Sequence, residues 1–198
     1  KGKRNLISAY GAINNVERTD SLDIAGISSQ LVFPGLIFVS RFARSADEKV
    51  VYGGCDAMNR AMVDFCSSDS NRLLSVGYLS LRNPEKALEA AKQGIKMGIK
   101  AFWMTSDSVE GRAPSHIAND PIWAVLEEAG VPITLHIGSG AKLSKSYRNT
   151  GIKRELAAGS MNVETTSPKD LPVLHHSIER WLMCMIYDGV LERFPKLK

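Results

Sequence analysis

The sequence is poor in cysteine, and its three cysteines form no recognisable framework. Cys55, Cys66 and Cys184 show neither a C-x-x-C motif nor a nearby histidine at zinc-ribbon spacing, so they indicate neither disulfides nor a structural zinc site. Free thiols suit a reducing compartment, and we expect a cytoplasmic protein.

Long hydrophobic runs are also absent. No stretch reaches the roughly 20 apolar residues that a membrane-spanning helix needs. The basic start, Lys1 to Asn5, is similar to the first region of a signal peptide, but the apolar run after it is only a few residues long. We therefore predict no membrane partner.

Neither sign of charge dominates. The chain has 25 Lys and Arg against 21 Asp and Glu, and the net charge of +4 is spread along the sequence, which argues against a nucleic-acid partner. The densest basic stretch lies in a segment rich in Gly, Ser and Asn and contains Lys142, Lys145, Arg148, Lys153 and Arg154. We interpret it as a solvated loop, with a phosphate-binding patch as the alternative.

Phosphate-binding glycine motifs are missing as well. No G-x-G-x-x-G motif or P-loop follows any predicted strand, which argues against a doubly wound nucleotide-binding fold. The nearest imitation, Gly138-Ser139-Gly140, lacks the third glycine. The 44% hydrophobic and 23% charged residues are instead typical of an ordinary globular domain.

Short apolar runs alternate with helical patterns along the chain, which predicts parallel strands joined by crossover helices. The predicted strands cover residues 28–34, 73–81, 100–106 and 132–138. The predicted helices cover residues 19–25, about 49–66, 84–97, 120–129 and a final stripe over 178–186 that stops at Gly189. Residues 139–170 lack a period and are interpreted as a long loop.

The ends of the chain interrupt this alternation. The first predicted helix has no convincing strand before it, and the chain finishes at 194–198, where the next strand should begin. Four open parallel strands would expose two edges, which closure into an eight-stranded barrel removes. We therefore expect one domain, 1–198, that is the central part of a (β/α)8 TIM barrel. An open-edged piece is also expected to form a homo-oligomer.

Several segments resemble one family, the amidohydrolase-related metal-dependent hydrolases that include the aminocarboxymuconate-semialdehyde decarboxylase group. The matching residues are 22–27, Asn59, 71–73, 120–136 and 188–197, of which 120–136 is the most specific. The resemblance implies a distorted TIM barrel with a divalent metal, commonly zinc, at the carboxyl ends of the strands. It covers nearly the whole chain but only about half of a family member.

The family's metal pattern is a His-x-His pair on strand one, a His on strand five and an Asp on strand eight, with a further His on strand six for proton transfer. Only the strand-five position transfers to this sequence, to His136. That residue ends an apolar strand, where barrel enzymes place catalytic groups, and neutral imidazole suits zinc. The alternative is a strand-end histidine that bonds the backbone.

Other residues are candidates for contact with a substrate. Trp103 and Thr105 share one side of their strand, so one of them is placed to contact a planar substrate, although Trp103 has core packing as its alternative. His116 follows the same strand in a loop, and Arg41 or Arg44 suits a substrate carboxylate. His175 and His176 are adjacent and should point about 100° apart, which favours a surface role at a helix start over one shared site.

Two functions follow from these residues. The first is a metal-dependent hydrolase or non-oxidative decarboxylase of a small carboxylate-bearing substrate, in which the metal activates water or polarises the substrate. The second is a non-catalytic, degenerate or truncated barrel that acts as a binding or assembly module.

Overall fold

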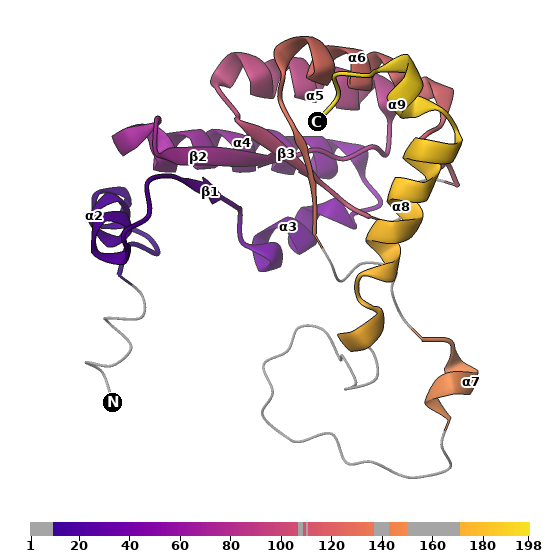
Figure 1. Ribbon diagram of the computed structural model, residues 1–198, viewed down its shortest axis with the longest axis horizontal. Coiled ribbons are helices and arrows are strands. Elements are labelled where there is room, and N and C mark those ends of the chain that lie inside the picture. Colours follow the sequence, from indigo (N-terminus) through magenta and orange to yellow (C-terminus); the bar gives the residue numbers. More distant parts are fainter. Residues whose placement is uncertain (1–9, 107–108, 110, 137–142, 150–170) are drawn as a thin grey trace.

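Four strands form one parallel sheet in the order β1-β2-β3-β4 (Figure 1). The computed structural model describes residues 10–106, 109, 111–136, 143–149 and 171–198. The strands are β1 (Gln30–Val32), β2 (Leu73–Tyr78), β3 (Ala101–Met104) and β4 (Ile133–Leu135). The predicted parallel sheet is confirmed, with shorter strands than the apolar runs suggested.

Helices connect and cover these strands. They are α2 (Asn15–Ala25), α3 (Leu36–Ala43), α4 (Glu48–Cys66), α5 (Pro84–Met97), α6 (Asp120–Ala129), α7 (Lys145–Arg148), α8 (His176–Tyr187) and α9 (Val190–Arg193), with short 3-10 turns η1 (Ser67–Asp69), η2 (Ile117–Asn119) and η3 (Leu171–Val173). Helices α5 and α6 lie on one side of the sheet and α3 on the other (Figure 1). None of the described helices has the length and apolarity needed to cross a membrane.

The bounds of α5 follow directly from its capping residues. The Asn83 side chain accepts hydrogen bonds from the backbone N–H groups of Glu85 and Lys86, at 3.1 and 3.2 Å, and so satisfies two donors that the first turn leaves open. Gly98 ends the helix at φ 99°, a left-handed conformation that glycine adopts without a steric penalty. Residues 84–97 are helical as predicted.

Three segments differ from the sequence-based prediction. Helix α3 was not among the predicted helices, and its Val39 packs against α4. Helix α2 begins at Asn15 and not at Thr19, since the Asn14 side chain caps it. Helix α7 interrupts the expected loop, whose residues 139–142 and 150–170 lie outside the described residues.

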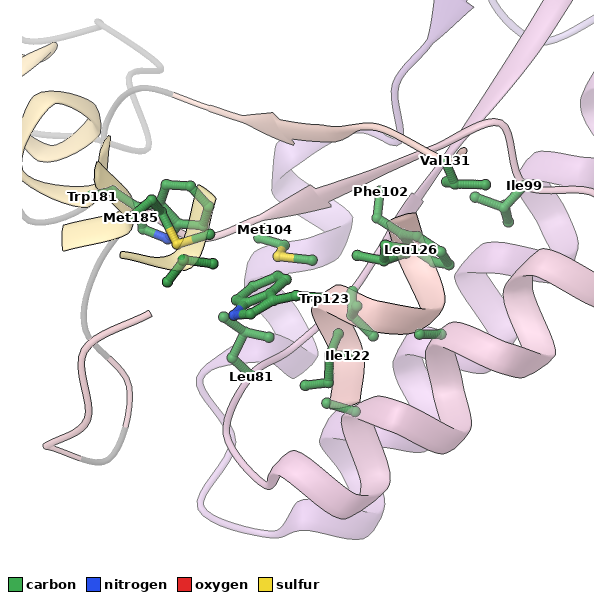
Figure 2. Packing of buried hydrophobic residues seen from close by; sticks show 14 residues of the cluster. Leu81, Ile99, Phe102, Met104, Ile122, Trp123, Leu126, Val131, Trp181 and Met185 are labelled. Atoms are coloured by element: carbon green, nitrogen blue, oxygen red, sulfur yellow. The ribbon is translucent and has the colours of Figure 1, made fainter. Parts of the chain in front are cut away.

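The larger core packs on one face of the sheet, which we call the α6 face. Its strand residues are Phe102, Met104, Ile133 and Leu135, and together with Leu79, the residue after β2, they meet Ile122, Trp123 and Leu126 of α6. Trp181 and Met185 of α8 join the same cluster (Figure 2). Because side chains alternate along a strand, the residues between these belong to the opposite face.

That opposite face, which we call the α3 face, buries a smaller cluster. Its strand residues are Val76, Tyr78, Ala101 and Trp103, and they pack with Val39 and Phe42 of α3 and with Val51 and Cys55 of α4. At the far edge of the sheet, the backbone N–H of Ile133 donates to the carbonyl of Lys198 at 2.8 Å. The last residue thus lies beside β4, where the next strand was predicted to begin.

Candidate functional site

Four rings form a continuous row on the α3 face, which we call the aromatic row. Its members are Phe42, Tyr78, Trp103 and His136. Neighbouring ring centroids lie 5.8, 5.2 and 5.3 Å apart, and the first two contacts are edge-to-face with interplanar angles of 74°. These are the separations and orientations that attractive aromatic pairs adopt.

Strand register explains how three of these rings meet. Tyr78 is the last residue of β2 and pairs with Trp103, while Trp103 pairs with Thr134 of β4. His136 lies two residues beyond Thr134 and therefore on the same face. All three rings lie near the carboxyl ends of parallel strands, which is the edge where α/β barrels build their active sites.

Trp103 brings a polar group to this row. Its side chain is 4% exposed, and its Nε1 has no hydrogen-bond partner among the described residues. A buried donor without an acceptor costs about 1–3 kcal/mol, so a ligand oxygen at this position would be stabilised. Trp123 and Trp181 also leave Nε1 unpaired, but they lie in the core of the α6 face. Only Trp103 of the three has the half-buried His136 ring as a neighbour.

Burial keeps the hydroxyl and thiol groups beside the row protonated. Desolvation raises the pKa of Tyr78, and the charges of Cys55 and Tyr52 raise it further, while Arg44 opposes the shift. Desolvation likewise raises the pKa of Tyr52 to about 12 and that of the Cys55 thiol to about 12. These groups are neutral at pH 7, so the thiol is not an activated nucleophile.

Asn59 of α4 holds the end of β2 in place. It is 2% exposed, its Oδ1 accepts from the Tyr78 N–H at 2.7 Å, and its Nδ2 donates to the Tyr78 carbonyl at 3.2 Å. Gly77 makes room for this contact, because a Cβ there would lie 2.9 Å from the Asn59 Oδ1. The sequence drew attention to Asn59 only through the family resemblance; the structure shows that it positions Tyr78.

The structure brings some of the candidate residues together. Trp103 and His136 are in direct ring contact, and Thr105 is half-buried just after β3, on the side of Trp103 by strand alternation. Arg41 is exposed in the last turn of α3. Arg44, the C-cap residue of the same helix, is the cation whose charge reaches Tyr78.

His116 has different surroundings. It is exposed at the start of η2, and its Nδ1 accepts a hydrogen bond from the Ala118 N–H at 3.2 Å. Such a bond is the local capping interaction of a turn. This bond holds the His116 ring to its own turn.

Sequence reasoning missed two members of the row. Tyr78 shares a face with Val76 because the two are separated by one residue, and this alternation was visible in the sequence. Phe42 could not be found in this way, since its helix was not predicted. The proposed metal ligand, His136, lies where the sequence placed it, at the carboxyl end of β4.

Comparison with known proteins identifies the family. The amidohydrolase family profile matches residues 17–198, so the chain belongs to the amidohydrolase family. Its four parallel strands and helices are part of a (β/α)8 barrel of that type. No curated protein matches the chain.

Solved structures share the fold at low sequence identity. An amidohydrolase from Mycobacterium avium subsp. paratuberculosis K-10 has a TM-score of 0.73 at 23% identity, over 98% of this chain and 49% of that one. The 2,6-dihydroxybenzoate decarboxylase from Rhizobium has a TM-score of 0.64 at 17% identity, over 91% and 53%. The 5-carboxyvanillate decarboxylase from Novosphingobium aromaticivorans DSM 12444, complexed with manganese and 4-hydroxy-3-methoxy-5-nitrobenzoic acid, has a TM-score of 0.64 at 18% identity, over 91% and 47%. The chain spans about half the length of these proteins.

Proposed function

We propose that this chain forms part of the active site of a metal-dependent hydrolase or non-oxidative decarboxylase that acts on a small carboxylate-bearing substrate with a planar ring. The observation that supports this most is the contact of His136 with Trp103, at 5.3 Å between ring centroids, at the carboxyl edge of the sheet. Membership of the amidohydrolase family favours this enzyme over the non-catalytic assembly module.

His136 fits the role of one ligand to a divalent metal. Its imidazole is half-buried just after β4, so part of the ring stays accessible. Imidazole binds zinc and other divalent transition metals, and one of the structural neighbours holds manganese. When bound, the metal would act as a Lewis acid and lower the pKa of a coordinated water towards about 7.

The other residues of the row would bind and orient the substrate. Edge-to-face packing on Trp103 suits a planar ring, and the unpaired Nε1–H suits a carboxylate or phenol oxygen. The neutral Tyr78 hydroxyl is a donor or acceptor at the same edge. Arg44 or Arg41 would attract the carboxylate by its charge, and Thr105 would line the opening.

Metal analysis of the purified chain tests the role of His136. In a background that carries His175→Ala and His176→Ala, so that this exposed histidine pair does not contribute, we expect His136→Ala to lower bound zinc or manganese, measured by mass spectrometry after dialysis, by at least about tenfold, because loss of even an outer-shell partner costs about 10–100-fold in metal affinity. His116→Ala is the matched control, since this histidine is exposed and engaged in its own turn. Retention of a full metal equivalent at the barrel site by His136→Ala would remove the residue from that site.

A further inference from the structure

A second cluster of metal-binding side chains lies at the start of α8. His175, His176 and Glu179 each offer one ligand atom, and these atoms all lie within 4.8 Å of one another. The two imidazole rings are 4.7 Å apart between centroids, and the His175 Nε2 lies 3.4 Å from the Glu179 Oε1. All three side chains are exposed, so a dissolved ion can reach them.

The expectation that adjacent histidines point apart is wrong at this position. Glu179 follows His175 by four residues and His176 by three, and both spacings place side chains on the same side of a helix. His175 is the N-cap residue, with φ −75° and ψ −20°, and its ring is in edge-to-face contact with that of His176. Both rings therefore converge on one carboxylate.

The backbone beneath the cluster is firmly held. Ser177 is fully buried, and its Oγ accepts a hydrogen bond from the Ser106 Oγ at 2.8 Å, which connects the first turn of α8 to the segment just after β3. The carbonyl of His175 accepts from the N–H groups of Ile178 and Glu179 at 2.9 and 3.1 Å. Trp181 anchors the next turn in the core. Metal binding would thus need to order only three side-chain ends.

We propose that His175, His176 and Glu179 bind a late first-row transition-metal ion, such as Zn²⁺, Ni²⁺ or Cu²⁺, at a site separate from His136. Two imidazoles with one carboxylate suit these ions, whereas Mg²⁺ and Ca²⁺ prefer oxygen ligands throughout. Bonds of about 2.0–2.2 Å place two ligand atoms at most about 4.4 Å apart. Small side-chain rotations bring the observed atoms within that limit, and solvent completes the coordination.

Calorimetric titration of the 198-residue chain with Ni²⁺ and Zn²⁺ tests the proposal, with His136→Ala as the parent background so that the barrel-edge histidine does not contribute. We expect one bound equivalent. We expect at least about tenfold weaker binding in each of the variants His175→Ala, His176→Ala and Glu179→Gln, because loss of even an outer-shell partner costs about 10–100-fold in metal affinity. His116→Ala, which removes the other remaining histidine, should change the affinity less than about twofold.

Nuclear magnetic resonance gives a second readout that does not depend on affinity. Substoichiometric Cu²⁺ should broaden the imidazole signals of His175 and His176 before that of His116. The three-residue site would be overturned if both histidine variants, or the Glu179→Gln variant, bound the metal as tightly as the parent. It would also be overturned if broadening began at His116 or if Mg²⁺ bound equally tightly. Unchanged melting temperatures should show that the exposed substitutions leave the fold intact.

Discussion

The α6 face and the α3 face use alternate residues of the same strands, yet they bury different kinds of groups. Among the residues that the structure describes, the buried cluster of the α6 face consists of aliphatic residues, Phe, Trp and Met, and its Phe102, Met104 and Trp123 are completely buried. The cluster of the α3 face contains Cys55 and Tyr78 and continues to the half-buried His136. One face therefore supplies stability, while the other keeps ionisable groups beside the strand ends.

The helices that pack on the two faces of the sheet also differ in how completely they cover it. Helices α5 and α6 close the α6 face with a continuous apolar contact (Figure 2). The eight-residue helix α3 packs on the other face, and its Leu36, Ile37 and Phe38 side chains remain 40%, 52% and 66% exposed. The α3 face is therefore covered by a shorter helix that leaves more apolar surface exposed.

The largest effect is expected from a substitution that overpacks the core of the α6 face. Gly94→Ala should lower the free energy of unfolding by about 1–3 kcal/mol, because the new Cβ would lie 2.5 Å from the Cζ of the fully buried Phe102 on the α6 face. Chemical denaturation measures the change.

Gly53→Ala in α4 is the matched control for that substitution. No atom lies within 4 Å of its added Cβ, so it should show only the helix-propensity gain of up to about 1 kcal/mol. Equal changes in stability for the two variants would show that the α6 face is not tightly packed at Phe102.

Alkaline pH should act through the α3 face. Burial raises the pKa of Cys55 to about 12, whereas an unfolded thiol titrates near about 8.5. The stability linked to this group is complete below the unfolded value and is lost as pH rises towards the folded value. We expect Cys55 to contribute a loss of about 1 kcal/mol between pH 9 and pH 10, measured by urea unfolding as the difference between the parent and Cys55→Ala.

The variant Cys55→Ala separates this linkage from general alkaline damage. It should be less stable than the parent at pH 7 but should lose less stability between pH 9 and pH 10. An identical pH slope in parent and variant would mean that the thiol titrates alike in the folded and unfolded chains.

The smallest expected effect concerns ligand binding. Trp103→Phe keeps an aromatic ring but removes the unpaired Nε1–H, and we expect about 2–10-fold weaker binding of benzoate, a planar ring with one carboxylate that represents the proposed substrate class, which is the net value of one hydrogen bond. Trp123→Phe makes the same chemical change on the α6 face and should leave this affinity unchanged. Equal losses in both variants would point to general destabilisation and not to a contact with Trp103.

Most of the regular structure was predictable because local signals agreed with the tertiary contacts. Helix α5 has a capping Asn83, a first-turn proline and a terminal Gly98, and its bounds match the prediction. Helix α3 has no comparable signal. Its N-cap Gly35 provides no side-chain hydrogen bond, so contact with α4 decides its conformation.

The sequence by itself determined the parallel β/α alternation, the capped helices and the place of His136 at a strand end, because propensity, capping and the period of apolar residues act over a few neighbouring positions. Only the tertiary structure decided which groups meet at that end. Strand register and packing between distant segments bring Phe42, Tyr78 and Trp103 into contact and place Asn59 in hydrogen-bond contact with β2. The position at which α8 begins brings His175 and His176 together. No local pattern encodes those distances.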